Sequence, residues 1–410
     1  MATLAAQSPA PVALAPYDMS RPELYRDDVW QAPFRELRAS GGVHYTEQSD
    51  FGPYWSVSSY KPIVEVESLP DVYSSADGIT VAGFQEGDVR MPMFIAMDRP
   101  KHTGQRRTVA PAFTPSEMVR MSENVRMRTS EILDSLPIGE TFDWVDQVSI
   151  ELTTQMLAIL FDFPWEDRRK LTFWSDWAGD IEIAKDPELR KVRLQHMFEC
   201  AAYFSNLWNG KVGKEPTPDL ISMMIHSDAM AEMDQHEFLG NLILLIVGGN
   251  DTTRNSMSAY AHGLDMFPDE RAKLEANPGL IANTVQELIR WQTPLAHMRR
   301  LATQETELNG QRIREGDKVV LWYLSANRDE SVFEDADRII VDRPNARRHL
   351  AFGHGIHRCV GARLAEMQIG ILLEEMAKRR MRVNVLREPE RVAACFVHGY
   401  RKMPVELSRY

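Results

Sequence analysis

One cysteine lies in a glycine-rich loop, directly before a run of helix-forming residues. The loop spans residues 352–361 and contains Cys359, and the helix-forming run covers residues 362–379. A cysteine at this place faces the positive end of the helix dipole, which favours the thiolate over the thiol. The glycines let backbone N–H groups approach a sulfur or a flat ligand closely. Such a thiolate could be a nucleophile, one ligand of a metal ion or an axial ligand of haem iron, and the loop alone does not choose among these.

A second group of residues that could take part in chemistry lies inside a long helix-forming segment, residues 234–266. Adjacent Gly248 and Gly249 cost about 1 kcal/mol each in a helix interior relative to alanine, so something must offset them. A flat ligand lying close to the helix is one answer. Asp251 and Thr252 follow directly, and an acid beside a hydroxyl can relay protons into a buried site. A kinked helix whose polar side chains bond to backbone carbonyls explains the segment equally well when it is considered alone.

Charged pairs at helical spacing are the third kind of signal. Glu287 and Arg290 lie three residues apart and can form an ion pair on one helix face, although most such pairs are solvated and contribute little. His102 and Arg106 lie four apart and could both donate to an anion, although a surface helix is the commoner explanation. Further candidate donors, each more often structural when taken singly, are Arg300, His349 and His357.

Composition narrows the function classes. The 410-residue chain is 44% hydrophobic and 26% charged, which is typical of a globular protein. Its net charge of -12 argues against a duplex nucleic acid as a main partner. The only cysteines are Cys200, Cys359 and Cys395, so neither a disulfide framework nor a zinc site built from CxxC pairs is available. This usage fits a reducing cytoplasm, where we expect the protein to be located.

The elements that must position these residues are mainly helical. Residues 1–16 are rich in Ala and Pro and lack a basic start, so we expect a disordered leader. The most apolar run, residues 239–249, is shorter than the roughly 20 residues that span a bilayer. We expect one mainly helical domain over residues 17–410, with small β-sheets at one side. Helices are predicted at 21–39 (broken before Pro33), 116–136, 144–161, 165–212 (several), 234–266 and 283–292, strands at 43–45, 54–57 and within 308–320, a long loop at 74–97 and a hairpin at 391–407.

Together the motifs are much more specific than any one of them. At Phe352, Gly355, His357, Cys359 and Gly361 the chain resembles the haem loop of the cytochrome P-450 superfamily of haem-thiolate monooxygenases. The resemblance continues in the expected order along nearly the whole chain after the leader. Residues 248–253 resemble the oxygen-activation motif of the long central helix, and Glu287 and Arg290 resemble the pair that braces the haem loop, with Arg343 as its expected third partner. One mild departure is that His357 stands where many members have arginine.

The resemblance implies a single haem domain with the P-450 fold, haem b (iron protoporphyrin IX) as cofactor and O2 as co-substrate. Cys359 would be the protein ligand to iron, and Gly248 and Gly249 would leave room over the distal face. Thr252 would hydrogen-bond the dioxygen and Asp251 would supply protons. The resemblance implies four propionate donors, which are His102, Arg106, Arg300 and His357, and one weaker donor, His349. The other residues implied to contact haem are Phe352, Gly353 and Gly361.

We expect electrons to come from a separate protein, because the expected haem domain uses up the chain and leaves no room in it for a flavin or nicotinamide module. We expect them to pass from NAD(P)H through a ferredoxin reductase and a ferredoxin to a monomeric enzyme. An acidic ferredoxin would dock on basic residues near the haem segments, although several of these could instead neutralise the propionates. The basic residues are Lys101, Arg106, Arg107, Arg347, Arg348, Arg358 and Arg363.

For the substrate the resemblance is finer. Segments 142–145, 249–257, 290–300 and 355–361 are similar to the soluble bacterial alkane and fatty-acid hydroxylases of this superfamily, which oxidise the terminal methyl of medium-length chains. Residues 78–90 and 180–212 would form the mouth and lid of a narrow tunnel. Another apolar substrate, such as a terpene or steroid, and a haem sensor or carrier without turnover are the alternatives. The apolar residues expected to line the pocket are Leu244, Leu245, Val247, Leu295, Ala296, Met298, Phe396 and Val397.

Overall fold

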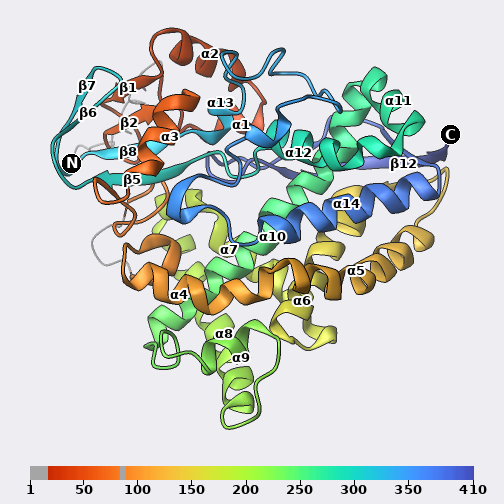
Figure 1. Ribbon diagram of the computed structural model, residues 1–410, viewed down its shortest axis with the longest axis horizontal. Helices are drawn as coiled ribbons and strands as arrows, with labels where there is room; N and C mark the ends of the chain where they lie inside the picture. The colour runs from red at the N-terminus through yellow and green to blue at the C-terminus, as the bar shows by residue number, and fades with distance from the viewer. Residues whose placement is uncertain (1–16, 84–88) are drawn as a thin grey trace, which may run out of the picture.

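Helices dominate the chain and four small sheets lie beside them, which confirms the predicted mainly α architecture. The computed structural model describes residues 17–83 and 89–410 (Figure 1), so the expected leader lies outside the described residues. Figure 1 shows α10 (Gln235–Met266) crossing the middle of the molecule, with most of the first sheet gathered to one side of it. The other α-helices are α1 (Pro22–Arg26), α2 (Gln31–Ala39), α3 (Tyr60–Ser68), α4 (Lys101–Val109), α5 (Pro115–Ser135), α6 (Glu151–Phe161), α7 (Arg169–Gly179), α8 (Pro187–Lys211), α9 (Leu220–Ile225), α11 (Pro268–Ala276), α12 (Ile281–Gln292), α13 (Tyr323–Ala326) and α14 (Ala362–Lys378).

The sheets are short and mostly antiparallel. The largest has the order β1-β2-β8-β5-β3, with only β2 and β8 parallel, and the others are β4-β12-β9, β6-β7 and β10-β11. The strands are β1 (Val43–Thr46), β2 (Tyr54–Val57), β3 (Tyr73–Ser74), β4 (Thr141–Asp143), β5 (Met298–Ala302), β6 (Thr306–Leu308), β7 (Gln311–Ile313), β8 (Lys318–Leu321), β9 (Met381–Val385), β10 (Glu390–Arg391), β11 (Tyr400–Lys402) and β12 (Pro404–Arg409).

Helix α10 begins and ends where its sequence predicts. The side chain of Asp234 accepts hydrogen bonds from the backbone N–H groups of His236 (2.8 Å) and Glu237 (2.9 Å), which satisfies donors that the helix itself leaves free. Pro268 disfavours helical backbone at Phe267, where the helix stops. Most side chains of α10 are buried all round the helix, as expected for one that other elements enclose. No helix among the described residues has both the length and the apolar character needed to cross a membrane.

Three apolar clusters fill the interior. The first joins α4 to α10, the second joins the N-terminal helices to the large sheet, and the third joins α5, α10, α12 and α14 to the C-terminal strands. The expected pocket residues Leu244, Leu245 and Val247 belong to or pack on the first cluster. The other five belong to or pack on the second cluster. The expected pocket is therefore the place where the first and second clusters face each other.

Two local predictions are wrong. The helix at 21–39 breaks at residues 27–30, where Asp28 has a φ of 53°, and Pro33 lies inside the first turn of α2, where its missing N–H is tolerated. The tail does not form one hairpin. Strand β10 pairs with β11, while β12 pairs with β4 and β9.

The described residues between β3 and the short 3-10 helix at Phe94–Ala96 form a loop, as predicted for 74–97, and the first half of this loop is anchored to the sheet edge. Arg299 donates to the carbonyl of Gly78 (3.3 Å) and to the carboxylate of Asp77 (2.9 Å), and the backbone N–H of Val81 donates to Nε2 of His297 (3.0 Å). If the expected tunnel mouth at residues 78–90 moves, the moving part therefore has to follow Val81, the last of these anchored residues. Residues 84–88 of the expected mouth lie outside the described residues.

Candidate active site

The loop that carries Cys359 is held by its own backbone and by α14. The N–H of Cys359 donates to the carbonyl of Phe352 (2.8 Å), and Gly361 is the residue directly before α14. Gly353 and Gly355 have φ values of 67° and 64°, a conformation that residues with a Cβ rarely adopt. The loop therefore returns the cysteine to the start of the helix, as its sequence predicts.

The surroundings of Cys359 are those of a side chain that faces an internal space. Its surface is exposed, yet protein atoms crowd around it so closely that desolvation raises the pKa of the thiol. The Gly361 N–H and the guanidinium groups of Arg106 and Arg358 lower that pKa only in part. Burial therefore acts against the nearby positive groups in setting the charge of this thiol. Among residues 17–83 and 89–410, no group of three or more His, Cys, Asp and Glu residues lies together in a metal-binding arrangement.

The two glycines of α10 have different roles. A Cβ added at Gly248 would have no neighbour within 4 Å, and Gly248 is exposed although most of α10 is buried. A Cβ added at Gly249 would lie 2.8 Å from Cδ2 of Leu157 on α6. Only Gly248 borders open space, so the expectation that both glycines leave room over one face is wrong for Gly249, which permits close packing of α6 on α10.

Thr252 and Asp251 lie on the same turn as Gly248 but in different environments. The Thr252 hydroxyl, half-buried, donates to the carbonyl of Gly248 (2.8 Å), so part of the kink explanation holds, although α10 stays continuous. Asp251 is 2% exposed and accepts hydrogen bonds from Ser175 (2.9 Å) and Asn250 (3.2 Å). Burial raises the pKa of Asp251, and Arg254 and Ser175 offset this in part.

An ion-pair chain connects Asp251 with the surface. Arg254 lies 3.2 Å from Asp251 and 2.7 Å from Asp176 on α7, whose side chain is 52% exposed. A Cβ added at Gly179 would lie 2.8 Å from the Asp251 carboxylate, so α7 fits this carboxylate closely. Sequence patterns did not single out Ser175, Gly179 or Arg254, because their importance depends on how α7 packs on α10.

A group of basic side chains converges near the loop. The ring centroids of His102 on α4 and His357 lie 4.3 Å apart, and Arg106 donates to the carbonyl of Arg358. Both ring nitrogens of His102 and Nδ1 of His357 are buried without a hydrogen-bond partner among the described residues. Desolvation lowers the pKa of both histidines, and neighbouring cations, Arg106 among them, lower it further. Buried donors beside uncompensated cations are the chemistry of a site for an anion.

Comparison with known proteins identifies the family. A sequence model of the family "Cytochrome P450" matches residues 269–384. The chain is 35% identical over 408 residues to linalool 8-monooxygenase of Pseudomonas putida, covering 95% of this chain and 98% of that protein. The chain belongs to the cytochrome P450 family. This family, together with relatives named monooxygenases, makes it a P450 monooxygenase, an enzyme that uses haem and O2.

Solved structures agree with this P450 assignment. CYP153D17 from Sphingomonas sp. PAMC 26605 is 81% identical with a TM-score of 0.93, covering 96% of this chain and 99% of that chain. Cytochrome P450-153 from Novosphingobium aromaticivorans is 59% identical with a TM-score of 0.92, covering 96% of this chain and 100% of that chain. The predicted P450 fold is therefore confirmed.

The residues of this P450 fit a haem group. Cys359 has an accessible surface, Gly248 borders open space, and the unpartnered nitrogens of His102 and His357 could donate to the propionates. Arg300 on β5 is 4% exposed and pairs with Glu67 at 3.2 Å. When bound, haem supplies the iron centre at which O2 is activated. Cys359 would hold the iron, and the basic side chains would hold the propionates.

His349 is not brought into this basic group. One of its ring nitrogens lies 3.3 Å from Oε1 of Gln286 on α12, and the other accepts from the N–H of Ala351 (3.2 Å). Its ring packs against Phe352 with a centroid distance of 5.3 Å. Burial lowers its pKa to about 3, so it is neutral. These contacts make His349 a support for Phe352 instead of a propionate donor.

Glu287, Arg290 and Arg343 form a buried ionic cluster. Glu287 lies 2.7 Å from Arg290 and 2.9 Å from Arg343, and all three are almost fully buried. Arg290 also donates to the carbonyls of Asn327, Ala336 and Arg338, which lie on the chain segment before the haem loop. The direct contact places Arg343 as the third partner, which sequence spacing alone left less certain. The cluster ties α12 to the segment that leads into the loop.

Two of the expected pocket residues, Val247 and Val397, lie close to Gly179. A Cβ added there would lie 3.7 Å from Val247 on α10 and 3.8 Å from Val397 in the C-terminal loop. The loop is tied to the chain before β5, because the N–H of Ala296 donates to the carbonyl of Phe396 (2.8 Å). Ala296 is fully buried, so its side chain is core rather than lining. Leu244, Val247 and Leu295 keep part of their surface accessible.

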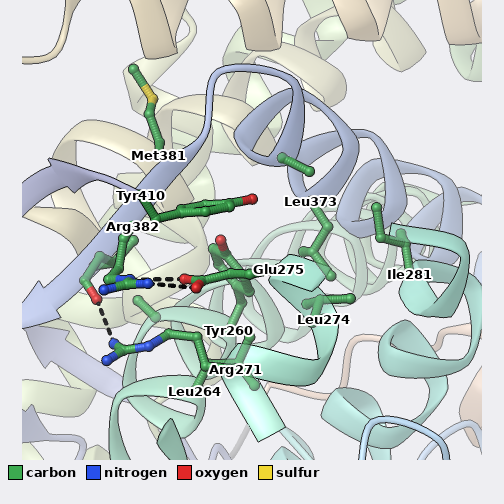
Figure 2. Close-up of a pocket in the computed structure, with 13 residues that line it drawn as sticks. Tyr260, Leu264, Arg271, Leu274, Glu275, Ile281, Leu373, Met381, Arg382 and Tyr410 are labelled. Carbon is green, nitrogen blue, oxygen red and sulfur yellow. Dashed lines mark hydrogen bonds and ion pairs between the residues drawn. The ribbon is translucent and has the colours of Figure 1, made fainter. Parts of the chain in front are cut away.

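A small cavity lies elsewhere, between the C-terminal half of α10 and the elements α11, α14 and β9. Its volume is about 30 Å³, room for roughly one water molecule. Figure 2 shows its polar wall, where Glu275 pairs with Arg382 beside Tyr410. This cavity is too small for a substrate and borders none of the haem-loop residues.

Proposed function

We propose that this P450 hydroxylates the terminal methyl group of medium-chain n-alkanes or fatty acids. The observation that carries the proposal is the apolar lining that joins two clusters at Gly179, beside the Asp251 carboxylate and one turn from Gly248. Apolar walls favour a hydrocarbon over a sugar or nucleotide. Primary C–H bonds are stronger than secondary ones, so terminal attack requires that the walls present only the chain end.

The names of relatives support attack at a chain end. The chain is 30% identical over 398 residues to the methyl-branched lipid omega-hydroxylase of Mycobacterium tuberculosis, covering 93% of this chain and 92% of that protein. Other relatives favour a second candidate, a terpene or steroid. They include linalool 8-monooxygenase and, at 32% identity over 396 residues, the steroid C26-monooxygenase of Mycolicibacterium smegmatis.

A substrate panel separates the two candidates. The ferric holoenzyme is titrated with n-octane, octanoic acid, linalool and cholest-4-en-3-one, and the Soret shift is recorded. Products are then analysed with a surrogate ferredoxin and reductase. We expect the largest shifts with a linear chain and the terminal alcohol as main product. Internal alcohols as main products, or no shift with any linear chain, would overturn the proposal.

A matched pair of variants tests the lining. Val247→Phe places a large ring where Val247 borders Gly179 and should weaken binding of linear chains at least tenfold. Val119→Phe adds the same ring on α5 at a residue that is 75% exposed, and binding should stay unchanged. Equal affinities in the two variants would show that Val247 does not line the pocket.

Electrons would come from NAD(P)H through a ferredoxin reductase and an acidic ferredoxin that docks near α14. Arg107, Arg347, Arg358 and Arg363 are exposed, and in the described part of the chain none of them has an ion pair. Lys101, in contrast, pairs with Glu237 (2.7 Å). Unpaired surface cations are available to a partner and speed association at low salt.

Charge reversal tests this docking. Arg363→Glu should raise the KM for ferredoxin several-fold at low ionic strength and leave the carbon-monoxide spectrum of the dithionite-reduced protein unchanged. Arg314→Glu, a reversal at an exposed arginine next to β7, is the control. The same KM in both variants would rule out docking at Arg363.

A further inference from the structure

A buried carboxylate on α3 packs directly on the haem loop. Glu67 is 4% exposed and lies on the same buried side of α3 as Ile63. A Cβ added at Gly355 would lie 2.2 Å from the Glu67 backbone carbonyl, and one at Gly353 would lie 3.4 Å from its Oε1. The Gly355 backbone therefore approaches Glu67 more closely than a residue with a Cβ would allow, and a Cβ at Gly353 would lie at ordinary contact distance from the carboxylate.

The Glu67 carboxylate links the haem loop to Arg300, one of the basic residues expected to bind a propionate. Its Oε2 accepts a hydrogen bond from the backbone N–H of His354 (2.8 Å). Its Oε1 accepts from the hydroxyl of Tyr323 (2.6 Å) and lies 3.2 Å from Nη2 of Arg300. Tyr323 and Arg300 are 3% and 4% exposed, so their contacts with Glu67 are shielded from water.

The position of Arg300 gives this link a consequence for haem. Residues on β5 alternate between its two faces, so Arg300 points away from the face on which Arg299 binds Asp77 and Gly78. The Arg300 guanidinium is a fork with five donors, of which the chain engages Nη1 through the Arg299 carbonyl and Nη2 through Glu67. A charge buried without a partner is strongly unfavourable, so Glu67 both neutralises Arg300 and fixes the direction of its fork.

We infer that Glu67 is a positioning residue for haem. It aims Arg300 at a propionate, holds the backbone of residues 353–355 through the His354 N–H, and places one negative charge beside the propionates. A negative charge stabilises the ferric form over the ferrous form, so Glu67 lowers the reduction potential of the haem. This role requires haem binding but is independent of the substrate proposed above.

The test uses Glu67→Gln in the holoenzyme, with Glu65→Gln, an exposed acid on the same helix, as control. The amide keeps the shape of Glu67 but removes the charge and one acceptor. Loss of a hydrogen bond to a charged group predicts haem transfer to excess apomyoglobin on the order of tenfold faster. The midpoint potential of the ferric/ferrous couple should rise above that of both the parent and Glu65→Gln.

Glu67→Asp separates charge from shape, since it keeps the carboxylate but shortens its reach. We expect faster haem transfer with a potential close to that of the parent. A parent-like potential in Glu67→Gln, or an equal rise in Glu67→Asp, would overturn the electrostatic role. If Glu67→Gln takes up no haem, Tyr323→Phe tests the same link by removing one hydrogen bond to Oε1. Haem transfer from Tyr323→Phe at the rate of Glu65→Gln would overturn the positioning role.

Discussion

Replacing each glycine of the α10 pair by alanine should give opposite results. Both replacements should raise the free energy of unfolding by up to about 1 kcal/mol, because alanine is a better helix former than glycine. At Gly248 the new methyl has no neighbour within 4 Å, so the whole gain remains. At Gly249 the methyl would lie 2.8 Å from Cδ2 of Leu157, which is 1% exposed and has little room to move. Such overpacking costs about 1–3 kcal/mol.

The expected difference can be measured by calorimetry of the ferric holoenzyme. At about 2 cal/mol/K of unfolding entropy per residue, 1 kcal/mol corresponds to about 1 °C for 410 residues. Gly248→Ala should therefore unfold about 1–3 °C above Gly249→Ala. The order of substrate affinities should be reversed, since the methyl at 248 would occupy the open space that Gly248 borders. Titration with n-octane should show weaker binding for Gly248→Ala and parent-like binding for Gly249→Ala.

A double variant isolates the contact. Leu157→Ala alone removes buried methyl groups and should cost about 2–5 kcal/mol. In the presence of Gly249→Ala the cost should be smaller, because the new methyl fills part of the space. Additive effects, or a Gly249→Ala protein more stable than Gly248→Ala, would refute the assignment of Gly249 to packing and of Gly248 to open space.

Three further predictions concern buried titratable groups. Asp251→Asn removes the carboxylate next to Ser175 and should lower the rate of product formation at least tenfold while the carbon-monoxide spectrum stays that of a thiolate haem; an unchanged rate would exclude a proton-transfer role. Glu287→Gln leaves buried arginines uncompensated and should destabilise the holoenzyme by about 3–5 kcal/mol, seen as loss of haem retention on heating. Burial lowers the pKa of His297 to about 4, whereas an unfolded histidine titrates near 6.5. The unfolded chain alone binds this proton between those values, so stability should fall as the pH falls from 6.5 to 4. His297→Gln should make the free energy of unfolding, measured with urea, depend less on pH in this range. An unchanged pH dependence would contradict the lowered pKa of His297.

The sequence predicts the haem loop and the central helix well because each motif is local. The spacing within residues 352–361 fits one turn-and-helix geometry, and Asp251 and Thr252 follow Gly248 on one helix. Glu287 and Arg290 meet because residues three apart share a helix face. The apolar pattern of α10 and its Asp234 cap similarly fix the ends of that helix. Local chemistry of this kind does not depend on the rest of the chain.

Predictions failed where a residue serves a distant partner. The pattern did not show that Gly249 accommodates Leu157, which is 92 residues earlier in the chain. Pro33 suggested a break, but a proline in the first helical turn is tolerated, and the chain turns at Asp28 instead. The sequence predicted the long loop but not its anchors, because His297 and Arg299, which hold its first half, lie more than 200 residues later.

By itself, the sequence indicated the reaction class, because several separate motifs, among them those around Cys359 and around Asp251 and Thr252, resemble one family in the expected order. Only the tertiary structure decided how these groups are controlled. It brings α7 against Asp251, α3 with Glu67 against the haem loop, and the C-terminal loop with Val397 towards Val247. These are contacts between elements distant in sequence, and they form because apolar faces pack together, a force that fixes which surfaces meet without leaving a motif at either residue.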